Sequence, residues 1–274
     1  MGRAAGLGGR GGEEGELTSV RASEVSASRE VLAVSSDAVL PAAGRVVMVS
    51  GANRGIGLAV ARRLHADGYT LSLGARNVAA LARAVGSLGG ERVLCCRYDA
   101  DDRASASAWV DATVARFGRL DALVNNAGIL RRFPPDQPDE AALDDMWTVN
   151  VKAPYRLTAA ALPLLRKTGS GRIVNVVSTV GLRYKGGVPG YALTKFAAMA
   201  LTHVIRYAGW NDGVRVTALC PGETRTDMTA GIVATGHPAT EPETLAAIVS
   251  LVIALPNEAS VAALPINCVL ESTV

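Results

Sequence analysis

From residue 45 onward, short apolar runs alternate with longer segments whose apolar residues recur at helical spacing. The first run, Val46-Val47-Met48-Val49, is continuously apolar, as expected for a strand buried on both faces of a parallel sheet. Further strands are predicted over Thr70–Ala75, Arg92–Tyr98, Leu120–Asn125, Arg172–Val177, Val214–Leu219 and Leu264–Leu270. Helices are predicted over Leu58–His65, Val78–Leu88, Arg103–Phe117, Asp139–Leu165, Tyr191–Ala208 and Thr244–Leu255. Strands separated by such helices form right-handed βαβ units, so the pattern predicts an α/β, doubly wound, seven-stranded parallel sheet with helices on both faces.

Residues 1–43 have a different composition from the rest of the chain. Gly, Arg, Ser and Glu dominate there, and no apolar period is sustained. We therefore expect a disordered N-terminal extension over 1–43 and a single domain over 44–274. Arginine-glycine tracts can bind RNA, but this one is short and interrupted by Glu13 and Glu14, so we expect no nucleic-acid partner.

Composition excludes several other classes of protein. Hydrophobic residues make up 49% of the chain and charged residues 19%, which is typical of a globular protein with a sizeable core. The sequence contains no apolar run long enough to span a membrane, and the net charge of +3 does not by itself indicate nucleic acid. Its four cysteines and three histidines lack metal-site spacing, so no metal is expected. Cysteines within apolar strands indicate reduced thiols, and we expect a cytoplasmic protein.

A glycine-rich turn joins the first strand to the first helix. It reads Ser50-Gly51-Ala52-Asn53-Arg54-Gly55-Ile56-Gly57. Glycines allow backbone amides to approach a phosphate closely, and the N-terminus of the helix adds partial positive charge. In this strand–turn–helix setting, the turn predicts a dinucleotide-phosphate site formed by Gly51, Asn53, Arg54, Gly55, Ile56 and Gly57.

Tyr191 and Lys195 are spaced to lie one turn apart on one face of a helix, with Ser178 thirteen residues before the tyrosine. A phenol titrates near ~10, and a neighbouring ammonium favours its ionised form, so we expect the pair to lower the tyrosine pKa. A serine hydroxyl from a separate strand end would then hold a carbonyl oxygen beside Tyr191. The three residues predict acid–base chemistry on a C=O/CH–OH couple, although a Tyr-x-x-x-Lys match alone also occurs on ordinary helices.

Polar and small residues follow several of the other predicted strands. Asp99 would accept a hydrogen bond from an adenine amino group, or else cap the following helix. Asn126, Ala127 and Gly128, which follow Asn125, suit a turn beneath a cofactor or a turn that only supports the sheet. Pro221 and Gly222 interrupt the chain after the sixth predicted strand.

Together, the order and spacing of these motifs over roughly 45–270 resemble the short-chain dehydrogenase/reductase family, whose members have a small single-domain Rossmann fold. The resemblance implies that Asn150, Ser178, Tyr191 and Lys195 are catalytic. It also implies that Asn150 kinks its helix and holds a water that reaches the lysine. Thr226 is expected to bind the nicotinamide carboxamide, and Pro221, Gly222 and Thr224 are assigned to the cofactor site with it. Tyr191 and Lys195 belong to that site too.

The same resemblance implies a homodimer or homotetramer formed through the helix Tyr191–Ala208, where Phe196, Met199, Ala200 and His203 recur near helical spacing. The alternative is that this face is buried within one subunit. The chain lacks the Asp-Gly-Gly-like ending that is common in the family, which leaves the C-terminal subunit contacts undefined.

The choice of cofactor follows from the residues after the second strand. An acidic residue about twenty positions beyond the glycines would bind the ribose hydroxyl of NAD, but 71–90 contains neither Asp nor Glu. Arg76 stands there instead, and with Arg54 it suits the 2′-phosphate of NADP. NADP is therefore favoured and NAD is the alternative.

The sequence thus predicts an NADPH-dependent oxidoreductase that acts on a ketone or secondary alcohol, with Tyr191 as general acid/base. The alternatives are an NAD(H)-dependent alcohol dehydrogenase and a non-catalytic NADPH-binding sensor or scaffold. The small-molecule substrate would contact three loops, 129–135, 179–189 and 223–239, whose walls are mostly apolar.

Overall fold

The structure is a computed structural model of the 274-residue chain, and it describes residues 39–184 and 186–270. The predicted N-terminal extension falls outside the described residues as far as residue 38. Residues 39–43 already belong to the domain. The amide of Leu40 donates to the carbonyl of Ala254 at 2.7 Å, and Ala42 packs against the core, so the domain begins earlier than expected.

Helices and strands alternate along the chain, as predicted. In order they are β1 (Val46–Ser50), α1 (Gly55–Ala66), β2 (Thr70–Ala75), α2 (Val78–Val85), β3 (Val93–Arg97), α3 (Ser105–Phe117), β4 (Ala122–Asn125), α4 (Glu140–Trp147), α5 (Ala153–Lys167), β5 (Arg172–Val176), α6 (Pro189–Gly209), β6 (Arg215–Pro221), α7 (Ala230–Val233), α8 (Pro242–Ala254) and β7 (Ala263–Ile266). Short 3₁₀ turns cover Gly86–Leu88, Thr179–Gly181 and Trp210–Asp212, and a π-helical turn over Thr148–Lys152 joins α4 to α5.

All seven strands pair in parallel in the order β3-β2-β1-β4-β5-β6-β7, which confirms the predicted doubly wound Rossmann sheet. β1 lies between β2 and β4, with Val47 paired to Leu71 on one side and to Ala122 on the other. The chain therefore winds outward from β1 in both directions. In sheets of this kind, ligands bind at the carboxyl ends of the strands where the winding reverses.

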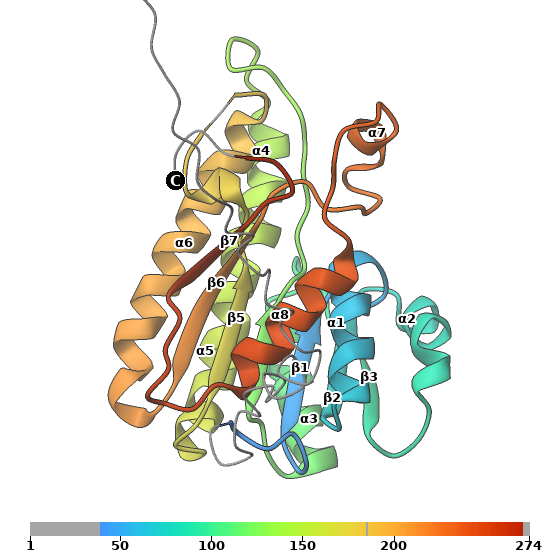
Figure 1. Cartoon of the computed structure of the whole chain (residues 1–274), viewed down its shortest axis with the longest axis vertical. Coiled ribbons are helices and arrows are strands. Elements are labelled where there is room, and N and C mark those ends of the chain that lie inside the picture. Colours follow the sequence, from blue (N-terminus) through green and yellow to red (C-terminus); the bar gives the residue numbers. More distant parts are fainter. Residues whose placement is uncertain (1–38, 185, 271–274) are drawn as a thin grey trace, which may run out of the picture. The chain divides into compact units, whose positions relative to one another are not determined.

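The sheet separates two apolar cores because alternate residues of a strand point to opposite faces. Val47 and Val49 of β1 join the core beneath α1, α2 and α8, whereas Met48 joins the core beneath α3, α5 and α6. Figure 1 shows α1 and α8 next to each other over one face, with α5 on the opposite face. Helices thus cover both faces, as expected.

The structure differs from the prediction mainly at element boundaries. The helix predicted over Asp139–Leu165 consists of α4, the π-helical turn and α5, and α7 in the loop after β6 was not predicted. β7 ends at Ile266 rather than at residue 270. Its last ladder bond runs from the amide of Gly222 to the carbonyl of Ile266, and Pro265 fits such an edge strand because it cannot donate a hydrogen bond.

Candidate active site

The glycine-rich turn lies at the carboxyl end of β1, and its backbone requires glycine. Gly51 and Gly55 have φ values of +66° and +53°, a region that disfavours residues with a Cβ. The N-cap residue of α1, Arg54, makes no side-chain capping bond, and the first turn of α1 contains no acidic residue. The first amides of α1 are therefore available to an anion, and this end of the helix fits the diphosphate of a dinucleotide.

A second segment supports this turn from the neighbouring strand β4. The Asn126 side chain donates to the carbonyls of Ser50 and Gly51 at 2.9 and 3.2 Å. In return, the Ser50 hydroxyl accepts the amides of Asn126 and Ala127, both at 3.0 Å. The predicted supporting role of this segment is therefore observed directly. Its contact with a cofactor stays a prediction.

Ser178 and Tyr191 come from different elements and meet at the same edge of the sheet. Ser178 follows β5 and caps the 3₁₀ turn Thr179–Gly181, where its hydroxyl accepts the amide of Val180 at 3.2 Å. Tyr191 lies in the first turn of α6, and its hydroxyl lies near enough to Ser178 for the serine side chain to lower the pKa of the phenol. The structure thus brings together two groups that are thirteen residues apart in the sequence.

Lys195 lies one turn further along α6 and is only 6% exposed. Its Nζ donates to the carbonyl of Val176 at 3.0 Å and lies 5.4 Å from the centre of the Tyr191 ring. Burial is the main influence on its pKa and lowers it to about 8, against a smaller opposing effect of Cys220. The amine therefore loses its proton near pH 8 rather than near its ordinary value of 10.5.

The pKa of Tyr191 departs from the prediction. We expected the neighbouring ammonium to lower it, but burial raises the pKa of Tyr191 to about 12, and the hydrogen bond to Ser178 opposes that rise only in part. The reason is physical: removing a phenolate from water costs more than the neighbouring hydroxyl returns. At neutral pH, Tyr191 carries its proton.

Asn150 lies in the π-helical turn, which corresponds to the predicted irregularity of this helix. Its Oδ1 accepts the amide of Ile129 at 2.9 Å, and its Nδ2 donates to the carbonyl of Ile129 and to Thr194 Oγ1 at 2.9 and 3.1 Å. It thereby joins the loop after β4 to the residue preceding Lys195. A Cβ on Gly128 would lie 3.3 Å from Asn150 Oδ1, so a glycine fits there. The predicted water relay stays untested.

The two arginines assigned to a 2′-phosphate have different surroundings. The exposed Arg54 pairs with Asp227 at 2.9 Å, a residue of the loop between β6 and α8. Arg76 is exposed immediately after β2, and its guanidinium has no ion-pair partner within the part of the chain that the structure describes. Asp227 was not predictable as the partner of Arg54, because no sequence spacing relates its loop to the glycine turn.

Asp99 and the residues after β6 lie near the same edge. Asp99 pairs with Arg97 at 2.7 Å and does not cap α3, whose N-cap residue is Ala104. Thr226 lies against the glycine turn, since a Cβ on Gly55 would be 3.2 Å from Thr226 Cγ2. Thr224 is buried and forms an isolated β-bridge with Thr240. This bridge closes the base of the loop that begins after Pro221 and Gly222.

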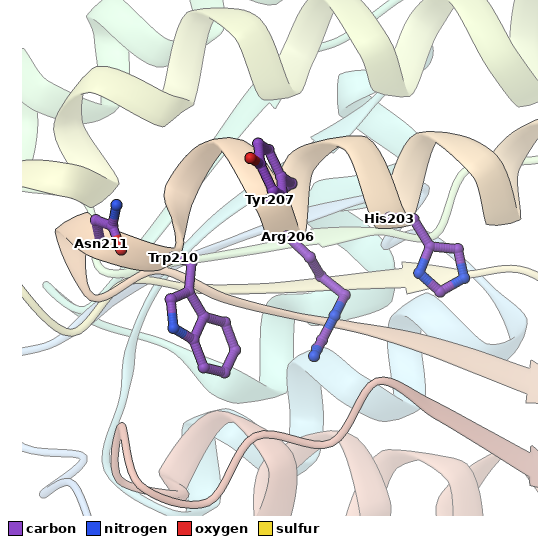
Figure 2. A pocket seen from close by; sticks show the side chains of 5 residues that line it. All are labelled: His203, Arg206, Tyr207, Trp210 and Asn211. Atoms are coloured by element: carbon purple, nitrogen blue, oxygen red, sulfur yellow. The ribbon is translucent and has the colours of Figure 1, made fainter.

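Two hollows lie at quite different places in the domain. One of about 230 Å³ lies beside the glycine turn, between Arg54, Gly55, Thr226 and Pro242. A larger one of about 530 Å³ lies along the C-terminal half of α6, whereas Tyr191 lies in the first turn of that helix. Figure 2 shows the residues that line it, His203, Arg206, Tyr207, Trp210 and Asn211. We place the active site by its chemical groups rather than by the size of the hollow.

Two features are absent from the described part of the chain. Among residues 39–184 and 186–270, no group of three or more His, Cys, Asp or Glu side chains is arranged to hold a metal. Over the same residues, no helix is long and apolar enough to span a bilayer.

Comparison with known proteins agrees with this geometry. The family model described as short chain dehydrogenase matches residues 45–236. Agropine synthesis reductase of Rhizobium rhizogenes is 39% identical over 229 residues, which are 83% of this chain and 53% of that protein. The chain thus spans about half the length of this relative.

Solved structures with the same fold include complexes with both nicotinamide cofactors. An alcohol dehydrogenase from Thermococcus sibiricus, complexed with 5-hydroxy-NADP, is 32% identical with a TM-score of 0.73, covering 81% of this chain and 95% of that one. A 3-ketoacyl-(acyl-carrier-protein) reductase from Brucella melitensis, complexed with NADH, is 26% identical with a TM-score of 0.76, covering 82% and 97%. Since the family model spans most of the described domain, the chain belongs to the short-chain dehydrogenase/reductase family.

Proposed function

We propose that the protein is an NADPH-dependent oxidoreductase that transfers a hydride between the nicotinamide cofactor and a ketone or secondary alcohol. The observation that carries this proposal is the Tyr191 side chain, which lies beside Ser178 with the buried Lys195 Nζ 5.4 Å from the centre of its ring, at the sheet edge that also holds the glycine-rich turn. The names of the similar proteins, which include reductases and an alcohol dehydrogenase, support the same reaction type.

In this proposal, the bound nicotinamide supplies or accepts the hydride. The cofactor would be held by the glycine-rich turn, by the segment Asn126–Gly128, and by Thr224 and Thr226. Ser178 donates a hydrogen bond to the substrate oxygen and fixes its position beside Tyr191. Tyr191 then donates its proton to that oxygen as the alcohol forms, which its pKa of about 12 permits because the phenol is protonated at neutral pH.

Lys195 stabilises the phenolate that proton donation leaves behind. Below its pKa of about 8 the amine is charged, and a positive charge near the ring lowers the energy of the anion. Asn150 is a positioning residue in this proposal, because its side chain fixes Ile129 on one side and Thr194 on the other. In the direction of oxidation, Tyr191 must first lose its proton, so alcohol oxidation is expected to accelerate as the pH rises.

The preference for NADPH rests mainly on Arg76. Its exposed guanidinium follows β2, at the place where an acidic residue would bind the ribose hydroxyl of NAD. An Arg fork matches phosphate oxygens, and 71–90 contains no carboxylate that would repel them. The alternative is an NAD(H)-dependent alcohol dehydrogenase. A non-catalytic NADPH-binding sensor or scaffold is the other alternative, and the intact Ser178, Tyr191 and Lys195 disfavour it.

We further propose a cytoplasmic homodimer or homotetramer. The four cysteines are free thiols, as expected in a reducing compartment. A stripe of exposed apolar side chains runs along α6 and consists of Leu193, Phe196, Val204 and Tyr207. Exposed apolar patches of this kind commonly mark subunit contacts.

The proposed function is tested with a panel of ketones and secondary alcohols, NADPH and NADH, and the absorbance of the reduced nicotinamide. We expect wild-type turnover with at least one ketone, and a kcat lower by about 10²–10⁴-fold in Tyr191→Phe, since that is the usual contribution of general acid catalysis. The dissociation constant of NADPH should be unchanged, because the ring is retained.

Tyr155→Phe is the matched control, since Tyr155 is exposed and lies on α5 rather than on α6. Full turnover in Tyr191→Phe would exclude the proposed role of this hydroxyl. Tight NADPH binding without turnover of any carbonyl would favour the sensor or scaffold alternative.

A further inference from the structure

Gly190, the residue directly before Tyr191, has no room for a side chain. A Cβ at this position would clash with Cζ of Phe133, and it would lie 2.9 Å from Phe133 Cε1 and 2.8 Å from Met146 Cε. Gly190 is buried, and it lies in the first turn of α6 together with Tyr191. The ring of Phe133 therefore packs directly on the backbone of the turn that carries the proposed proton donor.

The segment that carries Phe133 is held at alternate residues. The amide and the carbonyl of Ile129 both bind the Asn150 side chain at 2.9 Å. Two residues later, the amide of Arg131 donates to Met146 Sδ at 3.2 Å, and two residues later again Phe133 packs on Gly190. This spacing is that of extended backbone. Three anchors in five residues make the segment a fixed wall beside the first turn of α6.

Phe133 is half-buried, whereas its neighbour Met146 is completely buried. One part of the ring is therefore fixed against Gly190 and Met146, and the remainder is accessible. Aromatic side chains that are fixed in this way define the shape of a site because they cannot move aside without opening a cavity.

We propose that Phe133 is a specificity-determining residue, whose ring on Gly190 limits the size of the substituent that a carbonyl substrate carries past the first turn of α6. This inference rests on the proposed function, because it assumes that the carbonyl oxygen lies at Tyr191 and Ser178. The favoured substrates are then ketones with one compact substituent. A difference of one methylene in an apolar pocket changes kcat/KM by about 10–200-fold, so removal of the ring should have a large effect.

The experiment uses a series of ketones that share one substituent and differ only in the other, which is methyl, isopropyl or phenyl. The readout is the ratio of kcat/KM for the phenyl ketone to that for the methyl ketone, with NADPH. Phe133→Ala should raise this ratio by at least about tenfold and leave the dissociation constant of NADPH unchanged. Phe117→Ala, which removes a ring at the C-terminal end of α3, is the matched control and should leave the ratio unchanged.

A second pair of variants separates this role from a general effect on folding. Gly190→Ala should displace the ring and lower kcat/KM for all three ketones. Adding Phe133→Leu removes the Cζ and Cε1 atoms that the new Cβ would meet, so the double variant should recover turnover of the methyl ketone and show a raised ratio.

An unchanged ratio in Phe133→Ala, or a double variant that is no better than Gly190→Ala, would overturn the inference alone, provided that the wild type turns over the series. A wild type that binds NADPH but reduces none of the ketones would overturn the proposed function, and the inference with it.

Discussion

Arg54 and Arg76, which the sequence assigns to one phosphate, differ in whether a carboxylate already pairs with the guanidinium. Arg54 pairs with Asp227, whereas Arg76 has no ion-pair partner among residues 39–184 and 186–270. Charge-assisted hydrogen bonds contribute ~1.5–3 kcal/mol, so Arg76→Ala should weaken NADPH binding by about 10–100-fold. NADH lacks the phosphate and should be affected far less. Arg54→Ala should cost less than Arg76→Ala, because its pair with Asp227 must be broken before it can bind the phosphate.

The measurement is the KM of both cofactors in each variant. Arg166→Ala is the matched control, because Arg166 is an exposed arginine with a carboxylate partner, Asp212, at 2.9 Å in another part of the domain. Raised salt should weaken NADPH more than NADH, since exposed charges are screened. Equal changes for both cofactors in Arg76→Ala would refute the assignment to the 2′-phosphate.

Lys195 predicts a dependence of stability on pH. Its pKa in the folded protein, about 8, lies below the ordinary value of 10.5, so between these values the unfolded chain binds more protons than the folded one. The contribution of Lys195 to the free energy of unfolding should therefore rise with pH from about 8 to 10.5. Below pH 8 the amine is charged in both states, so the buried charge destabilises the folded protein by its full amount.

Lys195→Met removes the buried charge and also the hydrogen bond to Val176. We expect a net gain of about 1–2 kcal/mol in the free energy of unfolding at pH 7, together with loss of activity, because the relief of the charge exceeds one hydrogen bond. Urea unfolding at several pH values measures the effect. The gain should shrink from pH 8 to pH 10.5, and an equal gain at every pH would contradict the explanation.

At the scale of elements, a buried charge cluster joins the amino ends of the strands, at the edge opposite the active site. Asp121, just before β4, is 1% exposed and accepts the amide of Val46 at 2.8 Å and two bonds from Arg119 at 2.9 and 2.7 Å. It lies 4.0 Å from the buried Arg45. Burial lowers the pKa of Arg45, and the Asp121 carboxylate opposes this effect, so Asp121 offsets part of the cost of burying that guanidinium. At the same edge, burial lowers the pKa of Arg172 to about 10.

Asp121→Asn should therefore destabilise the fold by about 3–5 kcal/mol, since it leaves the buried Arg45 guanidinium without its counter-charge. The melting temperature should fall by about 10 °C, and the activity per folded molecule should not change because the site lies at the other edge. Asp212→Asn, which breaks the exposed pair with Arg166, should cost less than ~1 kcal/mol. Similar losses in both variants would show that burial does not decide the cost.

The elements were predictable from the sequence where a short-range signal exists. Continuous apolar runs such as Val46–Val49 identify the central strands, and the glycines of the turn after β1 indicate the positions where φ is positive. The pairing of Arg54 with Asp227 and the packing of Phe133 on Gly190 were not predictable, because both join loops that only the tertiary fold brings together. The pKa of Tyr191 was predicted in the wrong direction, since sequence spacing reveals the neighbouring lysine but not the extent of burial.

At the scale of the whole molecule, the stripe along α6 determines the expected assembly. Val204 and Tyr207 are 63% and 92% exposed, and they share one helical face with Leu193 and Phe196, because the four positions are separated by about one or two helical turns. Figure 2 shows Tyr207 pointing to a different side of α6 from Arg206 and Trp210, and all three border the hollow of about 530 Å³ along this helix. We expect an exposed apolar helix face of this kind to be buried against the same face of a second copy, because a two-fold dimer uses the same surface of both subunits.

A charge placed within such a contact should prevent it. We expect wild-type protein to elute from size-exclusion chromatography with light scattering at a multiple of 28.3 kDa, and Val204→Glu/Tyr207→Glu to give a smaller assembly with unchanged NADPH affinity. Leu251→Glu places the same charge at an exposed leucine of α8 on the opposite face of the sheet, and it should preserve any assembly formed through α6. A wild type of 28.3 kDa, or a double variant with the wild-type mass, would show that the α6 stripe is not the subunit contact.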